Sequence, residues 1–377
     1  MTPKKIIIVA GEASSDMHAA NLVKAIKDIN PNTEFFGLGG KGMEQAGVKL
    51  LYNLVDLAVV GFVEVLKNIG KIKYAFCLIL EKAKEIKPDA AILVDYPGFN
   101  LRLAKELKKI NIKVIYYISP QIWAWGLNRV KLIKKVVDKM LVLFKFEEEL
   151  YKRHGIDVLF VGHPFLDIVK PSTTQEEFLE ANDLSKNKLT IALMPGSRTR
   201  EVETLLLIML KSANLIQKDL SVQFIIIKSP TIPLAIFERL LNKTNLSVKV
   251  IENKTYDCIN ACDFVIVASG SATLEVAILQ KPMVIIYKVS FFTWAFLKFM
   301  LKIPYVGLVN VVAQDKIVPE CLQFEATPKM ISGKSLEIIT SPERINQIKK
   351  DLAQIKECLG KEGASLRAAN EIVKLIN

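Results

Sequence analysis

The chain has 377 residues, more than one hydrophobic core usually holds, and we therefore expect two domains. Hydrophobic residues make up 51% and charged residues 24%, which excludes a disordered or low-complexity protein. A formal net charge of +12 favours anionic partners, such as a phosphorylated substrate or an acidic membrane. The lysines are spread out and no helix-turn-helix, zinc-finger or RNP pattern is present, so we expect no nucleic-acid partner.

The start of the chain and its cysteines indicate a cytoplasmic protein. Lys4 and Lys5 lead directly into an apolar run at residues 6–10, so we expect no signal peptide. The five cysteines form no CxxC pair, and their odd number suits free thiols in a reducing compartment. Cys258 and Cys262 lie four residues apart, but no nearby histidine completes a zinc site.

The first half of the chain alternates between short apolar runs and helical patterns. This alternation predicts a mostly parallel sheet with helices on both faces. The helical patterns between the runs include residues 19–29 and 101–109. The predicted strands are residues 6–10, 90–94, 114–118, 140–144 and 158–161.

Small and acidic residues form the loop after the first predicted strand, which reads GEASSD at 11–16. The loop lacks the GxGxxG spacing, which argues against a nicotinamide or flavin cofactor. Glu12, Ser14 and Asp16 are candidates to bind sugar hydroxyls of an acceptor. The alternative is that Ser14 and Asp16 cap the helix that follows.

Two further loops follow strands of the first half. Asp95 comes directly after the strand 90–94 and begins a Pro-Gly turn, a position that suits a general base. The alternative is that Asp95 only stabilises its own turn. Trp123 and Trp125 lie in the loop SPQIWAW at 119–125, where they serve as packing anchors or as a platform for a sugar or acyl chain. His163, in a Gly-His-Pro turn, is better explained as a structural residue than as a base.

Two apolar segments flanked by lysines indicate contact with lipid. Neither residues 59–80 nor residues 291–301 form an uninterrupted span across a bilayer. For the first segment we predict a helix lying in the membrane interface, with packing against the sheet as the alternative. For the second segment the two interpretations are evenly balanced. The membrane-contact stripe of the first segment comprises Val63, Leu66, Ile69, Ile72 and Phe76.

The second half of the chain repeats the alternation after a polar segment, 167–188, which we interpret as a linker. We expect domains at residues 1–168 and 187–345, with helices at 346–377 that pack back across them. Both domains are predicted to be doubly wound and to bind ligands at the carboxyl ends of their strands, in a cleft between the domains. The predicted strands of the second half are residues 190–194, 223–228, 247–251, 264–267 and 283–287.

Two loops of the second domain suit a nucleotide diphosphate. The first reads MPGSR at 194–198 and contains Gly196, Ser197 and Arg198. The second reads ASGSATLE at 268–275 and opens a helical pattern that runs to about residue 280. Backbone amides at a helix start favour an anion, and an arginine can form two bonds to a phosphate.

Within the second loop, Glu275 is placed to accept bonds from a ribose, whereas Ser271 or Thr273 capping an ordinary helix is the alternative. A single loop of this kind leaves the two interpretations even, and the pair favours a nucleotide. No DxD or HExxH motif is present, so we expect no metal and no other cofactor.

Seven motifs resemble, in the same order, those of the lipid-A-disaccharide synthases. They are GEASSD at 11–16, VVGFVEVL at 59–66, VDYPGFN at 94–100, SPQIWAW at 119–125, FVGHP at 160–164, PGSR at 195–198 and ASGSATLE at 268–275. The resemblance implies the glycosyltransferase fold of two Rossmann-like domains facing a cleft, called GT-B. It implies transfer from UDP-2,3-diacylglucosamine to 2,3-diacylglucosamine 1-phosphate at the inner face of the cytoplasmic membrane. The enzyme would then be peripheral on an anionic surface and would make a β-1,6-linked disaccharide 1-phosphate, an intermediate of lipid A.

The resemblance also implies roles for individual residues. Asp95 matches the family's functional aspartate, Glu12 its first-loop glutamate and Arg198 its phosphate-loop arginine. Glu275 matches the acidic donor residue, and Asn310 matches an asparagine implicated in donor binding. The remaining donor-binding candidates are Gly196, Ser197, Ser269, Gly270, Ser271 and Thr273. Ser15 stands where the family usually has glycine, which would add strain if that position needs a positive φ.

The implied reaction inverts the donor's α linkage in one displacement. Asp95 would take the proton of the acceptor 6-hydroxyl, while Arg198 and the amides of residues 269–273 would stabilise the departing diphosphate. Two alternatives stay open. One is another sugar-nucleotide enzyme of this architecture, such as the peptidoglycan lipid N-acetylglucosamine transferase or a UDP-sugar 2-epimerase. The other is a non-enzymatic module that binds a nucleotide sugar or a membrane.

Overall fold

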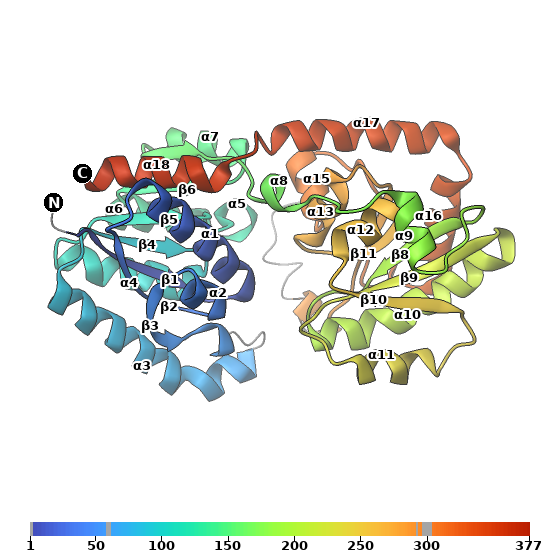
Figure 1. Ribbon diagram of the computed structural model, residues 1–377, viewed down its shortest axis with the longest axis horizontal. Coiled ribbons are helices and arrows are strands. Elements are labelled where there is room, and N and C mark those ends of the chain that lie inside the picture. The colour runs from blue at the N-terminus through green and yellow to red at the C-terminus, as the bar shows by residue number, and fades with distance from the viewer. Residues whose placement is uncertain (1–2, 58–61, 292, 296–303) are drawn as a thin grey trace. The chain divides into compact units, whose positions relative to one another are not determined.

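The computed structural model describes residues 3–57, 62–291, 293–295 and 304–377. The chain forms two compact units (Figure 1). Unit 1 comprises Met1–Pro164 and Leu359–Asn377, and unit 2 comprises Phe165–Cys358. The second unit therefore begins well before residue 187, where we expected it, and the first unit includes the end of the chain.

Unit 1 is built on a parallel sheet with the strand order β3-β2-β1-β4-β5-β6-β7. Helices cover both faces of this sheet (Figure 1). Its strands are β1 (Lys5–Ala10), β2 (Glu34–Gly39), β3 (Val48–Asn53), β4 (Ala90–Val94), β5 (Val114–Tyr117), β6 (Lys139–Val142) and β7 (Val158–Phe160). Its helices are α1 (Ala13–Ile29), α2 (Lys41–Gln45), α3 (Phe62–Ile86), α4 (Pro97–Lys109), α5 (Ile122–Trp125), α6 (Val130–Val136), α7 (Lys145–Arg153), α18 (Ala364–Ile376) and the 3-10 turns η1 (Val55–Leu57) and η2 (Leu127–Arg129).

Unit 2 repeats the design with a parallel sheet of the order β10-β9-β8-β11-β12-β13. Its strands are β8 (Leu189–Met194), β9 (Val222–Lys228), β10 (Val248–Glu252), β11 (Phe264–Ala268), β12 (Met283–Tyr287) and β13 (Glu320–Leu322). Its helices are α8 (Phe165–Ile168), α9 (Gln175–Ala181), α10 (Thr199–Asp219), α11 (Leu234–Leu241), α12 (Thr255–Ala261), α13 (Ala272–Ile278), α15 (Leu308–Ala313), α16 (Pro328–Ile339) and α17 (Pro342–Cys358).

Each sheet has one point at which the chain reverses its direction of travel across the strands. In unit 1 the point lies between β1 and β4, where Ala10 pairs with Val94. In unit 2 it lies between β8 and β11, where Met194 pairs with Val267. Ligands of doubly wound sheets bind at such switch points, beyond the carboxyl ends of the strands. The fold therefore brings the loop at 11–16 beside Asp95 in unit 1, and the two predicted donor loops together in unit 2.

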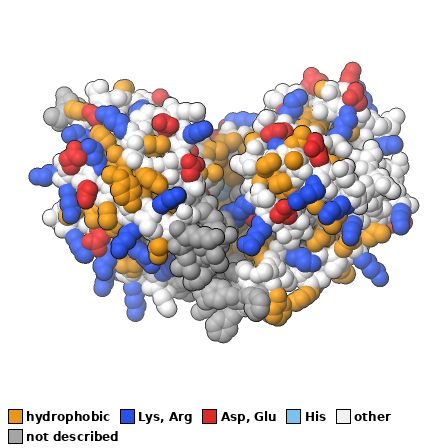
Figure 2. Space-filling view, turned by 90° about the horizontal axis from the view of Figure 1, so that it is seen from below, with side chains coloured by type: hydrophobic (Ala, Val, Ile, Leu, Met, Phe, Trp, Pro, Cys, Tyr) orange, Lys and Arg blue, Asp and Glu red, His pale blue; other side chains and the backbone are white. Residues whose placement is uncertain are grey.

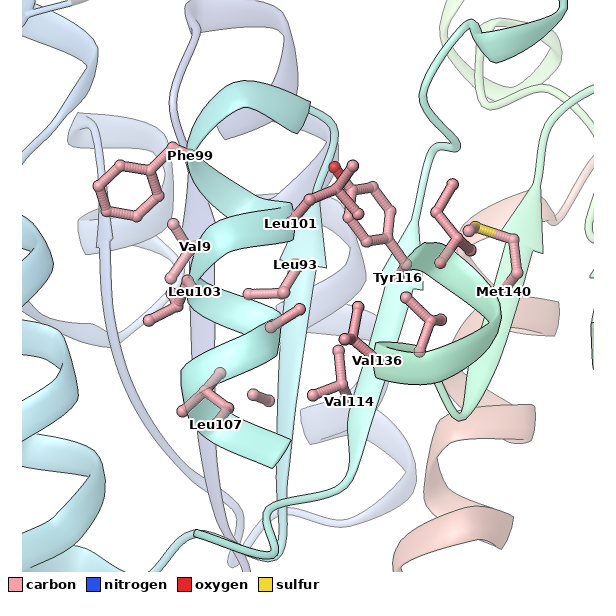
Figure 3. Packing of buried hydrophobic residues seen from close by; sticks show 14 of the residues in the cluster. Val9, Leu93, Phe99, Leu101, Leu103, Leu107, Val114, Tyr116, Val136 and Met140 are labelled. Atoms are coloured by element: carbon pink, nitrogen blue, oxygen red, sulfur yellow. The ribbon is translucent and has the colours of Figure 1, made fainter. Parts of the chain in front are cut away.

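The core of unit 1 supports the strands that end at its switch point. Figure 3 shows Val9, Leu93 and Tyr116 of the sheet facing Leu103 and Leu107 of α4. All of these side chains are fully buried. Burying a side chain of this size stabilises a fold by about 1.5–3 kcal/mol, so β1, β4 and β5 form a rigid base for the loops that follow them.

The polar segment at 167–188 belongs to unit 2 and is not a free linker. The Asp257 carboxylate on α12 accepts hydrogen bonds from the backbone N–H groups of Ser172 (2.6 Å) and Thr173 (3.0 Å) and from the Ser172 hydroxyl (2.8 Å). Thr174 then caps α9 by accepting a bond from the Glu177 N–H. The sequence did not reveal this attachment because the partner carboxylate, Asp257, lies far along the chain.

The helices at the end of the chain divide between the units. α17 packs on α13, α15 and α16 of unit 2, whereas α18 packs on α1 of unit 1. The Arg367 side chain on α18 donates to the Val161 carbonyl (2.8 Å), and the His163 N–H donates to the Leu359 carbonyl (2.9 Å). These bonds hold the last helix to the end of β7.

The structure corrects part of the predicted membrane stripe on α3. Ile72 and Phe76 pack against the hydrophobic core of unit 1, and the Phe76 ring meets the Phe99 ring edge-on at 5.4 Å. Ile69 is 59% exposed, so it keeps the position that the prediction requires. The side chains of Val63 and Leu66 lie outside the described part of the structure.

Of the second apolar segment, residues 292 and 296–301 lie outside the described ranges, and Phe291 is exposed. A helix that is both long and apolar enough to cross a membrane is not found anywhere in the described ranges.

Candidate active site

Asp95 lies in a strained and firmly held turn between β4 and α4. Asp95 and Tyr96 both have φ of 47°, in the left-handed region that residues other than glycine rarely occupy. The Asp95 N–H donates to the Tyr117 carbonyl (3.0 Å). The Asp95 carbonyl accepts bonds from the Tyr116 hydroxyl (2.6 Å) and the Asn100 side-chain amide (2.7 Å). These bonds fix the backbone that carries the predicted base.

The surroundings of Asp95 make its carboxylate a better base than a solvent-exposed one. Burial, followed by the nearby Glu12 carboxylate, raises the pKa of the Asp95 carboxyl to about 6, against a hydrogen bond from the Tyr96 N–H that lowers it. A general base works best when its pKa lies near the working pH. Asp95 is therefore ionised at neutral pH and still basic enough to accept a proton.

The first loop packs directly against the Asp95 turn. A Cβ placed on Gly11 would lie only 2.3 Å from the Tyr96 ring, so glycine is required where the two loops meet. Glu12 occupies the N-cap of α1. Ser15 lies in α1 without a positive φ, and its hydroxyl both accepts from the Glu12 N–H (2.9 Å) and donates to the Glu12 carbonyl (2.8 Å). The expected strain at Ser15 is therefore absent.

Asp16 has a structural role in this loop, and its predicted contact with an acceptor stays a prediction. Its buried carboxylate accepts bonds from the backbone N–H groups of Gly40 (2.7 Å), Gly42 (2.9 Å) and Met43 (3.2 Å). It thereby fixes the first loop to the start of α2. Ser14 is exposed, and Glu12 is the member of this loop whose charge reaches Asp95.

The first donor loop joins β8 to the long helix α10. Gly196 has φ of 111°, and a Cβ there would lie 2.5 Å from the Glu201 carboxylate. The Ser197 carbonyl accepts a bond from the Thr231 hydroxyl (2.9 Å), which fixes the loop while the Ser197 side chain stays exposed. Arg198 is half-exposed and lies 3.2 Å from Glu201. An incoming diphosphate would compete with Glu201 for this guanidinium.

The second donor loop joins β11 to α13, and hydrogen bonds of Ser269 and Thr273 hold it in place. The Ser269 N–H donates to the Ile286 carbonyl (2.8 Å), and its hydroxyl donates to the Val306 carbonyl (3.0 Å). The Thr273 side chain is buried, and its hydroxyl donates to the Gly270 carbonyl (2.8 Å). These bonds hold the turn together.

The amides of Gly270, Ser271 and Ala272 are the remaining candidates for the diphosphate. Gly270 and Ser271 come directly before α13, and Ala272 is its first residue. The first N–H groups of a helix have no acceptor within the helix. Gly270 has φ of 150° and open space where a side chain would lie, so a ligand can approach its backbone closely.

Glu275 is held by a residue that the sequence patterns did not single out. The Tyr256 hydroxyl on α12 donates to Glu275 Oε1 (3.2 Å). Burial raises the pKa of Glu275, and this hydrogen bond lowers it. The bond orients the carboxylate and leaves its second oxygen able to accept from a ribose. Tyr256 lies outside every motif, and only the fold brings it to α13.

Asn310, a predicted donor-binding residue, forms hydrogen bonds within the fold. Its side chain is fully buried and donates to the Val318 carbonyl (2.9 Å) and to Glu320 Oε1 (2.8 Å), while its own carbonyl accepts from the Val318 N–H (3.1 Å). The same Glu320 carboxylate accepts from the N–H groups of Val306 and Gly307. Asn310 therefore ties α15 to the segment that leads into β13, and Glu320 holds the segment before α15.

The two histidines of unit 1 that are buried do not act as cations. Burial lowers the pKa of His18 to about 4, and burial followed by the nearby His18 lowers the pKa of His163 to about 3. His163 packs 5.5 Å from the Phe144 ring, which agrees with the structural role that we expected.

Within the described residues, no group of three or more His, Cys, Asp or Glu side chains is arranged to hold a metal ion.

Residues 6–375 match the family described as lipid-A-disaccharide synthetase. The chain belongs to this family. The lipid-A-disaccharide synthase of Syntrophus aciditrophicus is 40% identical over 378 residues, which cover 100% of this chain and 99% of the relative. That of Trichlorobacter lovleyi is 41% identical over 375 residues, covering 99% and 98%.

Solved structures confirm the fold. The UDP-GlcNAc 2-epimerase from Neisseria meningitidis bound to UDP-GlcNAc aligns with a TM-score of 0.66 at 15% identity, covering 98% of this chain and 100% of that one. A glycosyltransferase from Rickettsia africae aligns with a TM-score of 0.59 at 13% identity, covering 100% and 99%. Both confirm two Rossmann-like units of the GT-B kind, as the sequence predicted for this lipid-A-disaccharide synthetase family member.

Proposed function

We propose that this family member joins UDP-2,3-diacylglucosamine to 2,3-diacylglucosamine 1-phosphate. The products are the β-1,6-linked lipid A disaccharide 1-phosphate and UDP. The observation that carries the proposal is Asp95, a carboxylate with a raised pKa in a rigidly held turn at the switch point of unit 1. It occurs in a chain that matches the family over nearly its whole length.

Asp95 acts as the general base in this proposal. The acceptor 6-hydroxyl oxygen attacks the anomeric carbon of the donor while its proton passes to the Asp95 carboxylate. The bond from that carbon to the UDP oxygen breaks in the same step, so one displacement converts the α linkage into a β linkage. A positioned base of this kind contributes about 100- to 10,000-fold to a rate.

Unit 2 holds the donor and stabilises the leaving diphosphate. Arg198 exchanges its contact with Glu201 for a phosphate, and the amides of Gly270, Ser271 and Ala272 face the second phosphate at the start of α13. Glu275, oriented by Tyr256, accepts from the ribose hydroxyls. These groups meet the developing charge with fixed dipoles and a guanidinium, so the proposed reaction uses no metal ion.

Both proposed substrates carry acyl chains, so the enzyme must work at a lipid surface. We place it on the anionic inner face of the cytoplasmic membrane as a peripheral protein. Figure 2 shows Lys and Arg side chains distributed over the face that it draws, in keeping with the net charge of +12. Ile69 and Tyr74 of α3 are exposed, as are Lys71 and Lys73 of the same helix, and we propose that this part of α3 touches lipid.

The test is UDP release in detergent with both acylated substrates, followed by identification of the lipid product. We expect UDP to appear only when donor and acceptor are both present, together with a β-linked disaccharide 1-phosphate. UDP release with a non-acylated donor and the peptidoglycan lipid carrier, or conversion of UDP-N-acetylglucosamine without an acceptor, would instead support one of the related sugar-nucleotide enzymes. No turnover of any of these substrates would contradict an enzymatic role.

A further inference from the structure

Glu147 is a buried carboxyl group to which the proposed reaction gives no part. It lies in the first turn of α7 and is 2% exposed. Its Oε1 accepts hydrogen bonds from the Ser119 hydroxyl (2.7 Å) and the Trp123 indole N–H (3.1 Å). Its Oε2 accepts from the Phe144 backbone N–H (3.3 Å). One side chain thus connects α7 to the SPQIW segment, residues 119–123.

The chemistry of these partners requires a carboxylate. The indole and the backbone N–H can only donate, and an ionised carboxylate can only accept. Burial raises the pKa of Glu147 to about 7, while the bonds from Ser119, Trp123 and Phe144 oppose that rise. Tyr151 of the same helix is the ionisable neighbour that Glu147 influences, and its hydroxyl donates to the Pro120 carbonyl (3.3 Å). A glutamine at 147 would turn its NH₂ toward one of the donors.

The SPQIW segment adjoins the proposed base. It follows β5, whose Tyr117 pairs with Val94, the residue before Asp95. Ile118 immediately precedes the segment and has φ of 64°, which for a β-branched residue is a genuine outlier. Such strain persists where the surroundings fix the backbone, as the bonds to Ser119, Pro120 and Trp123 do here. The backbone is therefore strained and held by hydrogen bonds at two neighbouring strand ends, at Asp95 and at Ile118.

Trp123, at the end of the SPQIW segment, forms part of an aromatic surface. Its ring meets the Phe146 ring edge-on at 5.4 Å, and Phe146 stacks on Phe144 at 5.5 Å. Trp123 and Phe146 are both only partly buried. An indole whose N–H is already bonded, and whose ring is partly open to solvent, suits contact with the apolar face of a sugar ring.

We propose that Glu147 is a positioning residue that holds Trp123 in place as one wall of the acceptor-sugar subsite beside Asp95. The inference rests on the proposed function, since it assumes that unit 1 receives the acceptor. Glu147 touches no reacting atom and acts through the indole. A purely structural Glu147 would instead support α7 and the SPQIW segment without any effect on acceptor binding.

The experiment compares Glu147→Gln, Trp123→Ala and the double variant in the UDP-release assay. We expect each single change to raise the acceptor KM by about ten-fold, the effect of losing one charged hydrogen bond or one aromatic wall. The double variant should be no worse than Trp123→Ala alone, because Glu147 acts through Trp123. UDP affinity by calorimetry should stay at the wild-type value. Glu149→Gln, an exposed carboxylate of the same helix, is the matched control and should leave all values unchanged.

The outcomes separate this inference from the proposed function. An inactive wild-type protein contradicts the function itself. An active wild type whose Glu147→Gln variant keeps the normal acceptor KM contradicts the inference alone, as does an additive double variant. If Glu147→Gln does not fold, Ser119→Ala removes one donor and keeps the carboxylate. An unchanged acceptor KM in both Ser119→Ala and Trp123→Ala then overturns the inference.

Discussion

Asp95, the proposed base, lies in surroundings that lower the stability of the folded protein. Its carboxylate ionises in a buried place beside Glu12, and its backbone occupies a strained conformation. Unfavourable conformations of this kind are common at functional sites, where the surrounding structure holds them in place. The cost of ionising the carboxylate and the cost of backbone strain can be separated experimentally, because only the ionisation depends on pH.

Replacing Asp95 with Asn should stabilise the protein at neutral pH. The folded-state pKa of about 6 lies above the ordinary 3.8, so the folded protein loses stability as pH rises from about 4 to about 6. Asn cannot ionise and tolerates a left-handed backbone. Its advantage should be absent near pH 4 and reach up to about 3 kcal/mol above pH 6. Urea unfolding of both proteins near pH 4 and at pH 7 measures this difference in the free energy of unfolding. If the Asn variant is no more stable than the wild type at pH 7, the assigned pKa is contradicted.

Glu12 should tune the pH dependence of the reaction. Because Asp95 must be ionised to act as a base, kcat/KM should fall as pH drops through about 6. Glu12→Gln removes a charge that raises the pKa of Asp95, so the acid limb should move to lower pH. The pH at which kcat/KM falls is measured separately from its maximum value. The maximum value also changes if Glu12 contacts the acceptor. An acid limb that does not move would show that another group titrates.

Arg198 and Glu275 should serve UDP binding. Arg198→Ala should weaken UDP affinity by about 1.5–3 kcal/mol, the effect of losing one charged hydrogen-bonding partner, and Glu275→Ala should act similarly. Arg200→Ala is the matched control, because Arg200 is exposed two residues further along the chain. Calorimetry on folded variants decides the matter. Unchanged affinity in both variants would place the nucleotide elsewhere.

Sequence patterns predicted site residues in the loops after strands, with Asp95 directly after β4 and Arg198 in the loop after β8. They did not reveal that Asp16, Ser269, Thr273 and Asn310 form hydrogen bonds within the fold, because these partners leave no pattern in the sequence. They did not find Glu147 or Tyr256. Glu147 lies in an acidic helical run that has the composition of a solvated face, and only the fold reveals its burial.

Among the elements, the strands with continuous apolar runs were predicted to within about two residues at each end. β2, with the sequence EFFGLG, was missed because its glycines interrupt the run, and β3 because Lys49 and Asn53 break up the short apolar run of VKLLYN. β13 is too short, at three residues, to give a pattern. The amphipathic pattern of α3 identified the helix and left open whether its apolar face meets lipid or the sheet.

Two isoleucines one turn apart on α3 separate those possibilities. Ile72 packs against the core, whereas Ile69 is exposed. Ile72→Ser should lower Tm without a specific effect on vesicle binding. Ile69→Ser should leave Tm unchanged and reduce co-sedimentation with anionic vesicles, because burying such a side chain in lipid contributes roughly 1.5–3 kcal/mol. If Ile69→Ser binds vesicles like the wild type, the membrane contact lies elsewhere.

For the whole molecule, the alternation of strands and helices was sufficient to predict two doubly wound units, and the seven motifs to predict the family. The unit boundaries were not predictable in the same way. The segment at 172–174 joins unit 2 through Asp257, and α18 returns to unit 1 through contacts with α1. Such long-range partners leave no local pattern in the sequence.

The proposed source of charge stabilisation predicts that activity survives EDTA. Arg198 and the amides at the start of α13 belong to the chain and cannot be removed by a chelator. Turnover after EDTA treatment and gel filtration should match that of the untreated enzyme. Loss of turnover that added Mg²⁺ restores would show that a metal ion carries part of the diphosphate charge.

The most direct measurement is the turnover of the Asp95→Asn variant with both acylated substrates. The variant keeps the size and backbone of the turn and removes the base, so UDP release should fall by roughly 100-fold or more. UDP affinity, measured by calorimetry on the same preparation, should stay unchanged because unit 2 is untouched. Turnover close to that of the wild type would contradict the assignment of Asp95 as the base on which the proposed mechanism depends.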